Sequence, residues 1–186
     1  MRTLGYAVLS LLSREDLSGY DLKRWMERPL GYFWSARHSQ IYPELARLEE
    51  EGFVTHHVVE QRERPDKKVY GITASGREAV REWVTEPPSS QATRDELVLK
   101  AYSIWLADPE AAAALFEEQE RLHEEQLRHY EEIEVWMQDN WGESPERMDF
   151  DRFASYAALR RGIGYERDYA EWCRWVAAKL EERRSV

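Results

Sequence analysis

The spacing of apolar positions predicts three short helices before residue 53, each with one inward face. These inward positions are, in chain order, Leu4, Val8 and Leu11, then Leu22, Trp25 and Met26, then Ile41, Leu45 and Leu48. Ser18, three residues before Asp21, is typical of a capping box at the start of the second helix. The third helix is expected to begin near Ser39, to tolerate Pro43 in its first turn and to end at Gly52.

After the third helix the pattern changes to β-branched and aromatic residues. The stretches 53–60 and 67–73 flank a short charged turn that contains Pro65, which favours a β-hairpin. Thr73 can then cap a fourth helix. Three helices, a hairpin and a helix follow one another in the order of a winged helix-turn-helix.

The stretch TEPPSSQAT, residues 85–93, concentrates Pro, Ser and Thr between two periodic segments. We therefore predict a winged-helix domain at 1–86, a linker at 87–94 and a helical domain at 95–186. The expected fold class is mainly α, with a two-stranded wing in the first domain and long helices in the second.

The second domain is predicted to contain two long helices after a short apolar stripe. The first begins at Pro109 and reaches about Trp141, and the second runs from about Phe150 to Arg183. In the first, four positions recur every seven residues: Phe116, His123, Tyr130 and Met137. Because the positions between them are largely polar, we expect packing against other helices rather than a two-stranded coiled coil.

The apolar face of the last predicted helix changes phase near Gly162 and Gly164. These glycines indicate either a close crossing of another helix or a bend. The pattern alone does not choose between the two.

The net charge of −10 at first disfavours a polyanionic partner such as DNA. Its distribution changes this picture, because residues 1–86 hold 13 basic and 14 acidic side chains, whereas 87–186 hold 13 basic and 22 acidic ones. The excess of negative charge therefore lies in the second domain. The first domain is close to neutral and remains compatible with DNA.

The chain lacks the sequence signals of a membrane or secreted protein. No apolar run approaches the ~20 residues that span a bilayer, and the N-terminal apolar stretch has no small-residue cleavage site after it. Cys173 is the single cysteine, so an internal disulfide is excluded. We expect a cytoplasmic protein in which Cys173 is a buried thiol rather than a redox sensor.

If the third helix packs through its apolar face, its opposite face is available to the DNA major groove. The candidate DNA-contacting residues there are Ser39, Gln40, Tyr42, Pro43 and Arg47, and Tyr20 in the second helix is included with them. Gln can pair with adenine, and Arg with guanine or phosphate. The acidic residues Glu44, Glu49, Glu50 and Glu51 must stay clear of the phosphates.

The hairpin tip supplies candidate contacts to the DNA backbone. Its basic residues are Arg62, Arg64, Lys67 and Lys68. The alternative for this tip is a solvated turn of mixed charge without a binding role. The alternative for the third helix is an ordinary solvent-exposed polar face. The complete order of elements favours the DNA interpretation for both.

Three stretches of the sequence resemble the PadR family of bacterial transcriptional regulators. They are SGYDL, FWSARHSQIYPELARLEEEGFV and RPDKKVYGITASGREAVREWV, and the resemblance extends through RDELVLKAYS to about residue 105. It implies a homodimeric winged-helix repressor with a helical C-terminal dimerisation domain, responding to small aromatic or xenobiotic molecules. In this chain Glu63 and Asp66 interrupt the basic wing, which predicts a weaker grip on phosphates.

A dimer of this kind would read an inverted repeat, with its two groove helices separated by one duplex turn, ~34 Å, or a multiple of it. Aromatic residues of the second domain are candidates for an effector pocket. The set is Trp105, Tyr130, Trp136, Tyr169 and Trp172. Packing of the core and the dimer is the alternative use of the same side chains.

Two other classes of protein are alternatives to a DNA-binding regulator for this sequence. A winged-helix module that binds proteins would share the fold without binding DNA. A helical-bundle metalloenzyme could use Glu120 and His123, but a di-metal site needs two such pairs and further carboxylates. We therefore expect no metal, no cofactor and no enzymatic activity.

Overall fold

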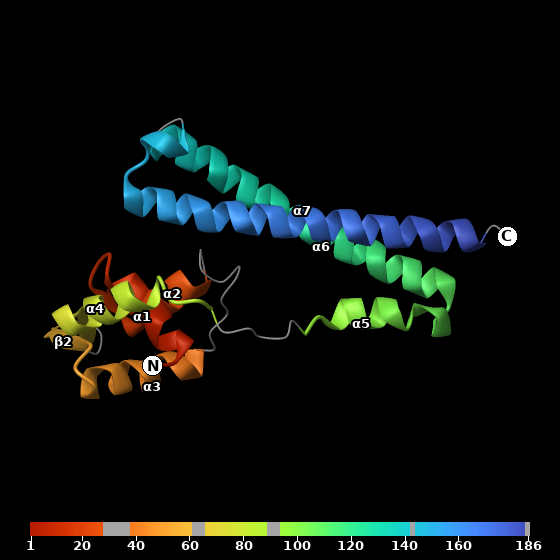
Figure 1. Cartoon of the computed structure of the whole chain (residues 1–186). Coiled ribbons are helices and arrows are strands. Elements are labelled where there is room, and N and C mark those ends of the chain that lie inside the picture. The colour runs from red at the N-terminus through yellow and green to blue at the C-terminus, as the bar shows by residue number, and fades with distance from the viewer. Residues whose placement is uncertain (28–37, 61–65, 89–93, 142–143, 185–186) are drawn as a thin grey trace. The chain divides into compact units, whose positions relative to one another are not determined.

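The computed structural model of the chain describes residues 1–27, 38–60, 66–88, 94–141 and 144–184 (Figure 1). The chain divides into two compact units, Met1–Gln91 and Ala92–Val186. The division falls within the stretch 87–94 that the sequence predicts as a linker.

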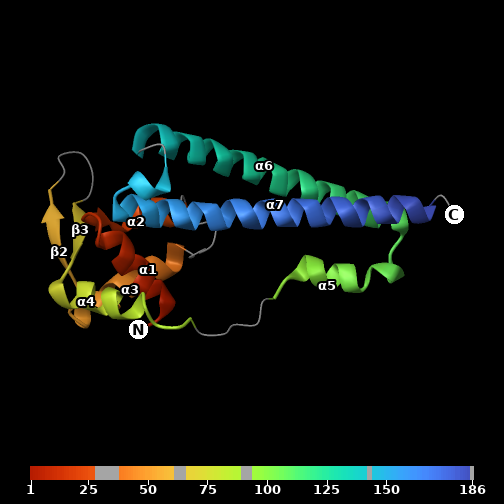
Figure 2. The ribbon, with the colours of Figure 1, turned by 45° about the horizontal axis from the view of Figure 1, so that its top comes forward.

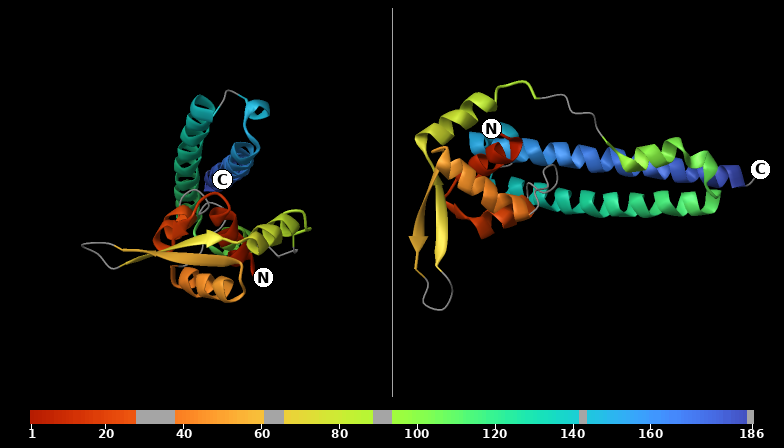
Figure 3. Two further views of the ribbon diagram at one scale, coloured as in Figure 1. Left: turned by 90° about the vertical axis from the view of Figure 1, so that its left-hand side faces the viewer. Right: turned by 90° about the horizontal axis from the view of Figure 1, so that it is seen from below.

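The first unit contains the predicted helices and hairpin in the predicted order. Its elements are α1 (Thr3–Leu12), β1 (Leu17–Ser18), α2 (Gly19–Glu27), α3 (His38–Glu50), β2 (Val54–Val59), β3 (Lys67–Ile72) and α4 (Ala74–Trp83). Figure 3 shows the β2–β3 ribbon reaching out beyond the helices of this unit. A winged helix with a mainly helical remainder is therefore confirmed as the fold class.

One strand was missed by the sequence prediction. β1 pairs antiparallel with β3, placing Leu17 opposite Tyr70, and the sheet has the order β1-β3-β2. A two-residue strand has no periodicity of its own, so only its pairing partner reveals it.

The core of the first unit joins all three helices that precede the hairpin. The inner face of α3 is anchored by Ile41, Leu45 and Leu48, each 0% exposed. Leu22 and Met26 of α2 are buried in the same cluster. Trp25, predicted to face inward with them, is instead 39% exposed, because a nine-residue helix buries only the narrow stripe that contacts its neighbours.

Polar caps set the starts of α2 and α4 as predicted. The Ser18 amide and hydroxyl donate to Asp21 Oδ2 at 3.2 and 2.6 Å, and the Asp21 amide donates to Ser18 Oγ at 3.2 Å. At α4, the amide of Gly76 donates to Thr73 Oγ1 at 3.1 Å. Both caps satisfy backbone N–H groups that have no partner inside their helix.

Gly52 ends α3 as predicted, in the left-handed conformation with φ of 77°. The Gly52 amide donates to the carbonyl of Glu49, and the Phe53 amide donates to that of Leu48 at 2.8 Å. This pair of bonds is the Schellman arrangement. It turns the chain sharply from α3 into the β2–β3 hairpin.

The second unit consists of helices. They are α5 (Glu96–Tyr102), the 3₁₀ turn η2 (Ile104–Leu106), α6 (Pro109–Trp141), the 3₁₀ turn η3 (Pro145–Arg147) and α7 (Phe150–Arg184). α6 begins and ends at the predicted residues. In Figures 1 and 2, α6 and α7 lie side by side and run in opposite directions.

The seven-residue repeat of α6 forms the face that packs on α7. Phe116, Tyr130 and Met137 are buried, and His123 is half-buried in line with them. Phe116 packs with Cys173 and Trp172 of α7, its ring centroid 5.5 Å from that of Trp172 in an edge-on arrangement. The predicted packing of α6 against another helix is thus confirmed, with α7 as the partner.

The two glycines of α7 have different surroundings. A Cβ built on Gly162 would lie 3.2 Å from the ring of Tyr130 on α6, whereas one on Gly164 would meet nothing within 4 Å. Since α7 is continuous through both positions, Gly162 serves a close helix crossing, which resolves the alternative left open by the sequence.

We predict opposite effects on stability for substitutions at these two glycines. Gly162→Leu should destabilise the second unit by about 1–3 kcal/mol, because the side chain would overpack against Tyr130. Gly164→Ala should stabilise it by about 0.5–1 kcal/mol through helix propensity alone. Urea unfolding followed by far-UV circular dichroism measures both, and equal effects at the two positions would contradict the assignment of the crossing to Gly162.

Candidate nucleic-acid interface

The N-terminal half of α3 presents an uncharged polar surface. Ser39, Gln40, Tyr42 and Pro43 are all exposed, while Ile41 between them is buried. This alternation follows from the helix period, because the buried positions fix the rotation of α3 about its axis. Four of the predicted groove-facing residues are thus brought together on one surface.

The acidic residues of α3, and Glu51 directly after it, mostly bond to neighbouring side chains. Glu44 is buried and bonds to the Arg47 guanidinium, which also bonds to Glu51 at 2.6 Å. Glu49 contacts His56 Nδ1 on β2. Glu50 is the fourth, and it is exposed. Three of the four carboxylates that must stay clear of DNA therefore have a partner within the first unit.

Arg47 lies where the sequence places it, but its guanidinium is engaged. Its bonds to Glu44 and Glu51 use three of its five N–H donors. A direct contact from Arg47 to DNA stays a prediction. In the geometry observed, Arg47 neutralises acidic groups on its own helix.

Tyr42 is positioned by a glycine that sequence reasoning did not select. The ring of Tyr42 lies over Gly19 at the start of α2, 2.5 Å from where a Cβ on Gly19 would be. The adjacent residue, Tyr20, is exposed. Tyr42 of α3 thus packs on the residue that precedes Tyr20 in α2. The signal that could have revealed this is a glycine directly after a capping residue.

The basic residues of the hairpin are not equivalent. The Lys67 ammonium pairs with Asp21 of α2 at 2.9 Å. Lys68 is exposed and has no ion pair within the part of the chain that the structure describes. The predicted contacts Arg62 and Arg64 lie outside the described residues.

Asp21 links the capping box to the base of the wing. The Lys67 ammonium and the Ser18 hydroxyl, in that order, lower the pKa of Asp21 below its usual value of 3.8. Because the folded pKa is depressed, the carboxylate stabilises the fold above the unfolded pKa, and this contribution is lost as the pH falls through the folded pKa.

We predict that Asp21→Asn destabilises the first unit at pH 7 by no more than about 1 kcal/mol, since the pair is partly exposed. The difference in stability between the variant and the wild type should shrink as the pH falls below ~4, where the wild-type carboxylate is increasingly protonated. Thermal unfolding at a series of pH values measures it. A difference that is constant with pH would contradict a role for the charge.

The five predicted effector-pocket residues are not gathered at one place within one chain. Trp105 precedes the first turn of α6 and is 78% exposed, whereas Trp136 is near the end of α6, roughly 40 Å along a helix of this length. Tyr130 is buried against Gly162. Tyr169 and Trp172 are neighbours, with ring centroids 5.4 Å apart. One chain alone therefore does not form a pocket from all five, because a count of aromatic residues does not fix how far apart helices place them, and their role as effector contacts stays a prediction.

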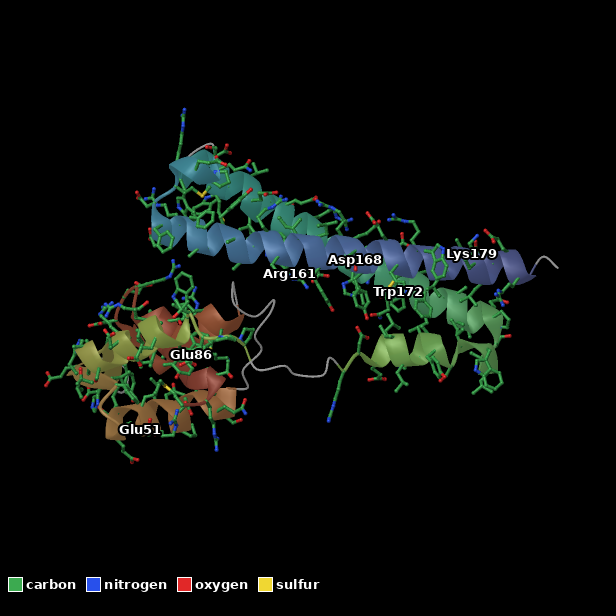
Figure 4. All side chains as sticks on the ribbon, in the orientation of Figure 1. Glu51, Glu86, Arg161, Asp168, Trp172 and Lys179 are labelled. Carbon is green, nitrogen blue, oxygen red and sulfur yellow. The ribbon has the colours of Figure 1, made fainter. Side chains whose placement is uncertain are left out.

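Figure 4 labels Trp172 among the side chains that lie between α5 and α7. It packs against Phe116, in a cluster that Leu97 and Ala101 of α5 also contact. Of the five predicted residues, Tyr169 lines a pocket of about 410 Å³ in the second unit, where it is joined by His123.

The metal alternative gains no support from the described residues. Glu120 bonds to Arg174 at 2.6 Å, and His123 bonds to Glu166. Within the described ranges there is no group of three or more His, Cys, Asp or Glu side chains placed to hold an ion. Cys173 is fully buried, as the sequence predicts, and burial raises the pKa of its thiol to about 11.

Among the described helices, none has both the length and the apolar composition needed to cross a membrane.

Comparisons with known proteins agree with this geometry. Residues 8–82 match the Transcriptional regulator PadR-like family, and residues 93–181 match the family described as Virulence activator alpha C-term. The negative transcriptional regulator PadR of Bacillus subtilis is 35% identical over 98% of this chain and 100% of its own length.

Solved structures share the fold of the whole chain. Bacillus subtilis PadR in complex with operator DNA has a TM-score of 0.82 and 34% identity, covering 96% of this chain and 99% of that one. The same protein in complex with p-coumaric acid has a TM-score of 0.75 at 34% identity, covering 97% and 99%. The virulence activator AphA of Vibrio cholerae has a TM-score of 0.74 at 29% identity, also covering 97% and 99%.

These relatives are transcriptional regulators rather than enzymes, as the sequence predicts for this chain. The identity extends over both units, and the matched structures include a DNA-bound one. The chain therefore belongs to the PadR-like family of transcriptional regulators.

Proposed function

We propose that this chain is a homodimeric repressor that binds an inverted-repeat operator through α3 and the β2–β3 wing and is controlled by a small aromatic effector. The observation that carries the proposal is the exposed, uncharged N-terminal half of α3, on a helix whose carboxylates are largely held by internal partners. The relative named a negative regulator, and its complex with operator DNA, support the repressor role.

Base readout is assigned to Gln40 and Tyr42. A Gln side chain can form paired hydrogen bonds to adenine N6 and N7, and a tyrosine hydroxyl can donate to or accept from a base edge or a phosphate. The apolar surface of Pro43, exposed beside Tyr42, suits a thymine methyl group. These neutral groups give sequence discrimination without requiring a charged side chain in the groove.

Backbone contacts are assigned to Ser39, at the N-terminus of α3, to Tyr20 and to the basic wing. The free N–H groups and positive dipole end of a helix favour a phosphate. Lys68 is exposed for such a contact, while Lys67 would have to leave Asp21 to join it. Arg62 and Arg64 remain predicted contacts of the wing.

The dimer is assigned to the second unit. The segment α5–η2 exposes large apolar side chains, which are Val98, Leu99, Tyr102, Trp105 and Leu106. A concentration of this kind on one short segment is typical of a protein interface rather than a solvated surface. A second copy of the chain is the partner that a palindromic operator requires.

The selection of binding sites from random duplexes tests the proposal. We expect an enriched inverted repeat whose half-site centres are ~34 Å apart, about one helical turn, or a multiple of it. Enrichment of no sequence would contradict operator recognition. It would instead favour the alternative of a winged-helix module that binds proteins, which no described feature supports independently.

The effector is supported by the complex of a relative with p-coumaric acid and by the aromatic content of the second unit. An effector acts only if it binds the DNA-competent and the DNA-incompetent dimers with different affinities. Measurement of operator affinity with and without a saturating ligand tests this control, and an unchanged affinity across a broad panel of aromatic compounds would contradict it.

A further inference from the structure

The ring of Tyr42 rests on the first residue of α2 through its hydroxyl end. A Cβ built on Gly19 would lie 2.5 Å from Cε1, 2.8 Å from Cζ and 3.1 Å from the hydroxyl oxygen of Tyr42. These atoms are at the end of the side chain that is farthest from its own backbone on α3. The contact fixes the direction in which the hydroxyl points, because rotation about the Cα–Cβ bond would carry the whole ring away from Gly19.

Tyr42 interacts with β3 as well as with α2. Burial raises the pKa of Tyr70 on β3, and the charge of Glu49 and then the Tyr42 phenol add to the rise. The side chain of Tyr42 nevertheless remains 48% exposed and lies outside the cluster of buried residues of the first unit. The ring is therefore held in one place without being part of the core.

The backbone at position 19 does not itself require a glycine. Among the glycines that the structure describes, only Gly52 has the positive φ that other residues avoid. Gly19 is the first residue of α2, and alanine is at least as favourable as glycine in a helix. The feature that requires a glycine here is the space that the ring of Tyr42 occupies.

The backbone on both sides of Gly19 is fixed. Ser18 pairs with Val69 in the sheet, and Ser18 and Asp21 bond to each other in the capping box. A methyl group at position 19 would lie closer to the Tyr42 ring than the ~3.5 Å at which carbon atoms pack. Because the backbone is tied on both sides, the ring would have to swing away, into the solvent that already reaches about half of it.

We propose that Gly19 determines operator specificity by leaving the space that holds Tyr42 in the orientation that reads a base. Gly19 needs no contact with DNA for this role, so it is a positioning residue that acts through Tyr42. The inference rests on the proposed base readout by α3 and adds a determinant from α2 to it. A side chain that is ordered before binding loses less conformational entropy when it contacts its partner, which favours tight and selective binding.

Gel-shift titrations of Gly19→Ala test the inference with two duplexes, the operator recovered by selection and a scrambled sequence. We expect the substitution to weaken operator binding by about five- to thirtyfold, in the range of one lost base contact. Binding to the scrambled duplex should not change, because non-specific binding depends on phosphate contacts. Thermal unfolding should show that the variant remains folded.

A double-mutant cycle shows whether the effect passes through Tyr42. In a Tyr42→Ala background there is no ring to displace, so Gly19→Ala should cause no further loss of operator affinity. Gly71→Ala is the matched control in the same unit. Its Cβ would meet the carboxylate of Asp16 at 2.8 Å, which is the flexible end of an exposed side chain and can move aside. This control should leave the affinities for both duplexes unchanged.

Three binding results would each overturn the inference: an unchanged operator affinity of Gly19→Ala, an equal weakening of both duplexes, or the same loss in the Tyr42→Ala background. A loss of stability in Gly19→Ala that Tyr42→Ala does not relieve would also overturn it, because the added methyl group would then act on something other than the ring. The wild type separates this inference from the proposed function. A wild type that binds both duplexes equally contradicts operator recognition itself, whereas a preference shared by the wild type and Gly19→Ala contradicts only the role of Gly19.

Discussion

The double substitution Gln40→Ala and Tyr42→Ala is expected to weaken binding to the selected operator by about 2–4 kcal/mol, roughly 30- to 1,000-fold. Binding to a scrambled duplex should change little. Both side chains are exposed on α3 and neither belongs to the cluster of buried residues that anchors the helix, so the fold should survive their removal. Gel-shift titrations with the two duplexes measure the effect, and thermal unfolding checks the fold.

Lys68→Gln is the control that separates base readout from phosphate binding. Lys68 is exposed on the wing and has no ion pair among the described residues. Its loss should therefore weaken binding to the operator and to the scrambled duplex by the same factor. The slope of log affinity against log salt should fall by about 1. If the α3 double variant lost affinity for both duplexes equally, Gln40 and Tyr42 would be backbone contacts and our assignment of base readout would be wrong.

Trp105→Glu is expected to convert the protein from dimer to monomer and to weaken operator binding by about 100-fold or more. A carboxylate within the α5–η2 apolar segment would have to be desolvated in the proposed dimer, at a cost that the interface cannot recover. A monomer loses the effective concentration that joins two half-sites, which contributes roughly 10²–10⁴ in affinity. Sedimentation velocity and gel shifts measure the two effects.

Val84→Glu provides a matched control in the first unit. Val84 is an exposed apolar residue like Trp105, at 67% against 78%, but it lies after α4 and outside the α5–η2 segment. The same change of charge at Val84 should leave the molecular mass from sedimentation velocity at that of two chains. A dimer that tolerates Trp105→Glu would place the interface elsewhere on the chain.

Local chemistry made the first unit predictable from the sequence. The inner face of α3, the Ser18–Asp21 box, the Gly52 stop and the Thr73 cap each depend on residues within a few positions of one another. Such short-range features can be recognised in the sequence because the helix period and the caps are properties of the local backbone.

Contacts between elements were not predictable in the same way. The pairings of Lys67 with Asp21 and of β1 with β3 join residues far apart in the chain, and that of His56 with Glu49 joins α3 to β2 across the turn at Gly52. These contacts decide which charges of the candidate interface are available, and only the folded arrangement supplies them. The Arg47 pairs are an intermediate case, because their spacing of three and four residues on one helix is visible in the sequence.

The predicted effector residues illustrate the same limit in the second unit. Aromatic side chains recur along α6 and α7 at helical spacing. Whether each one packs in the core or is available to a ligand depends on the element that its helix face contacts. Tyr130 is taken up by the crossing at Gly162, and Trp172 by the cluster around Phe116. Trp105 remains exposed within one chain and belongs to the segment that we propose as the interface between chains.

The central claim is that the exposed face of α3 reads the sequence of DNA. The most direct test compares the affinity of the wild-type chain for the selected operator with its affinity for a scrambled duplex, over a series of salt concentrations. We predict a preference of ~10³-fold or more for the operator, and an affinity that falls steeply as salt rises because several phosphates are contacted. Equal affinity for the two duplexes, or no shift of either at low salt, would contradict the account.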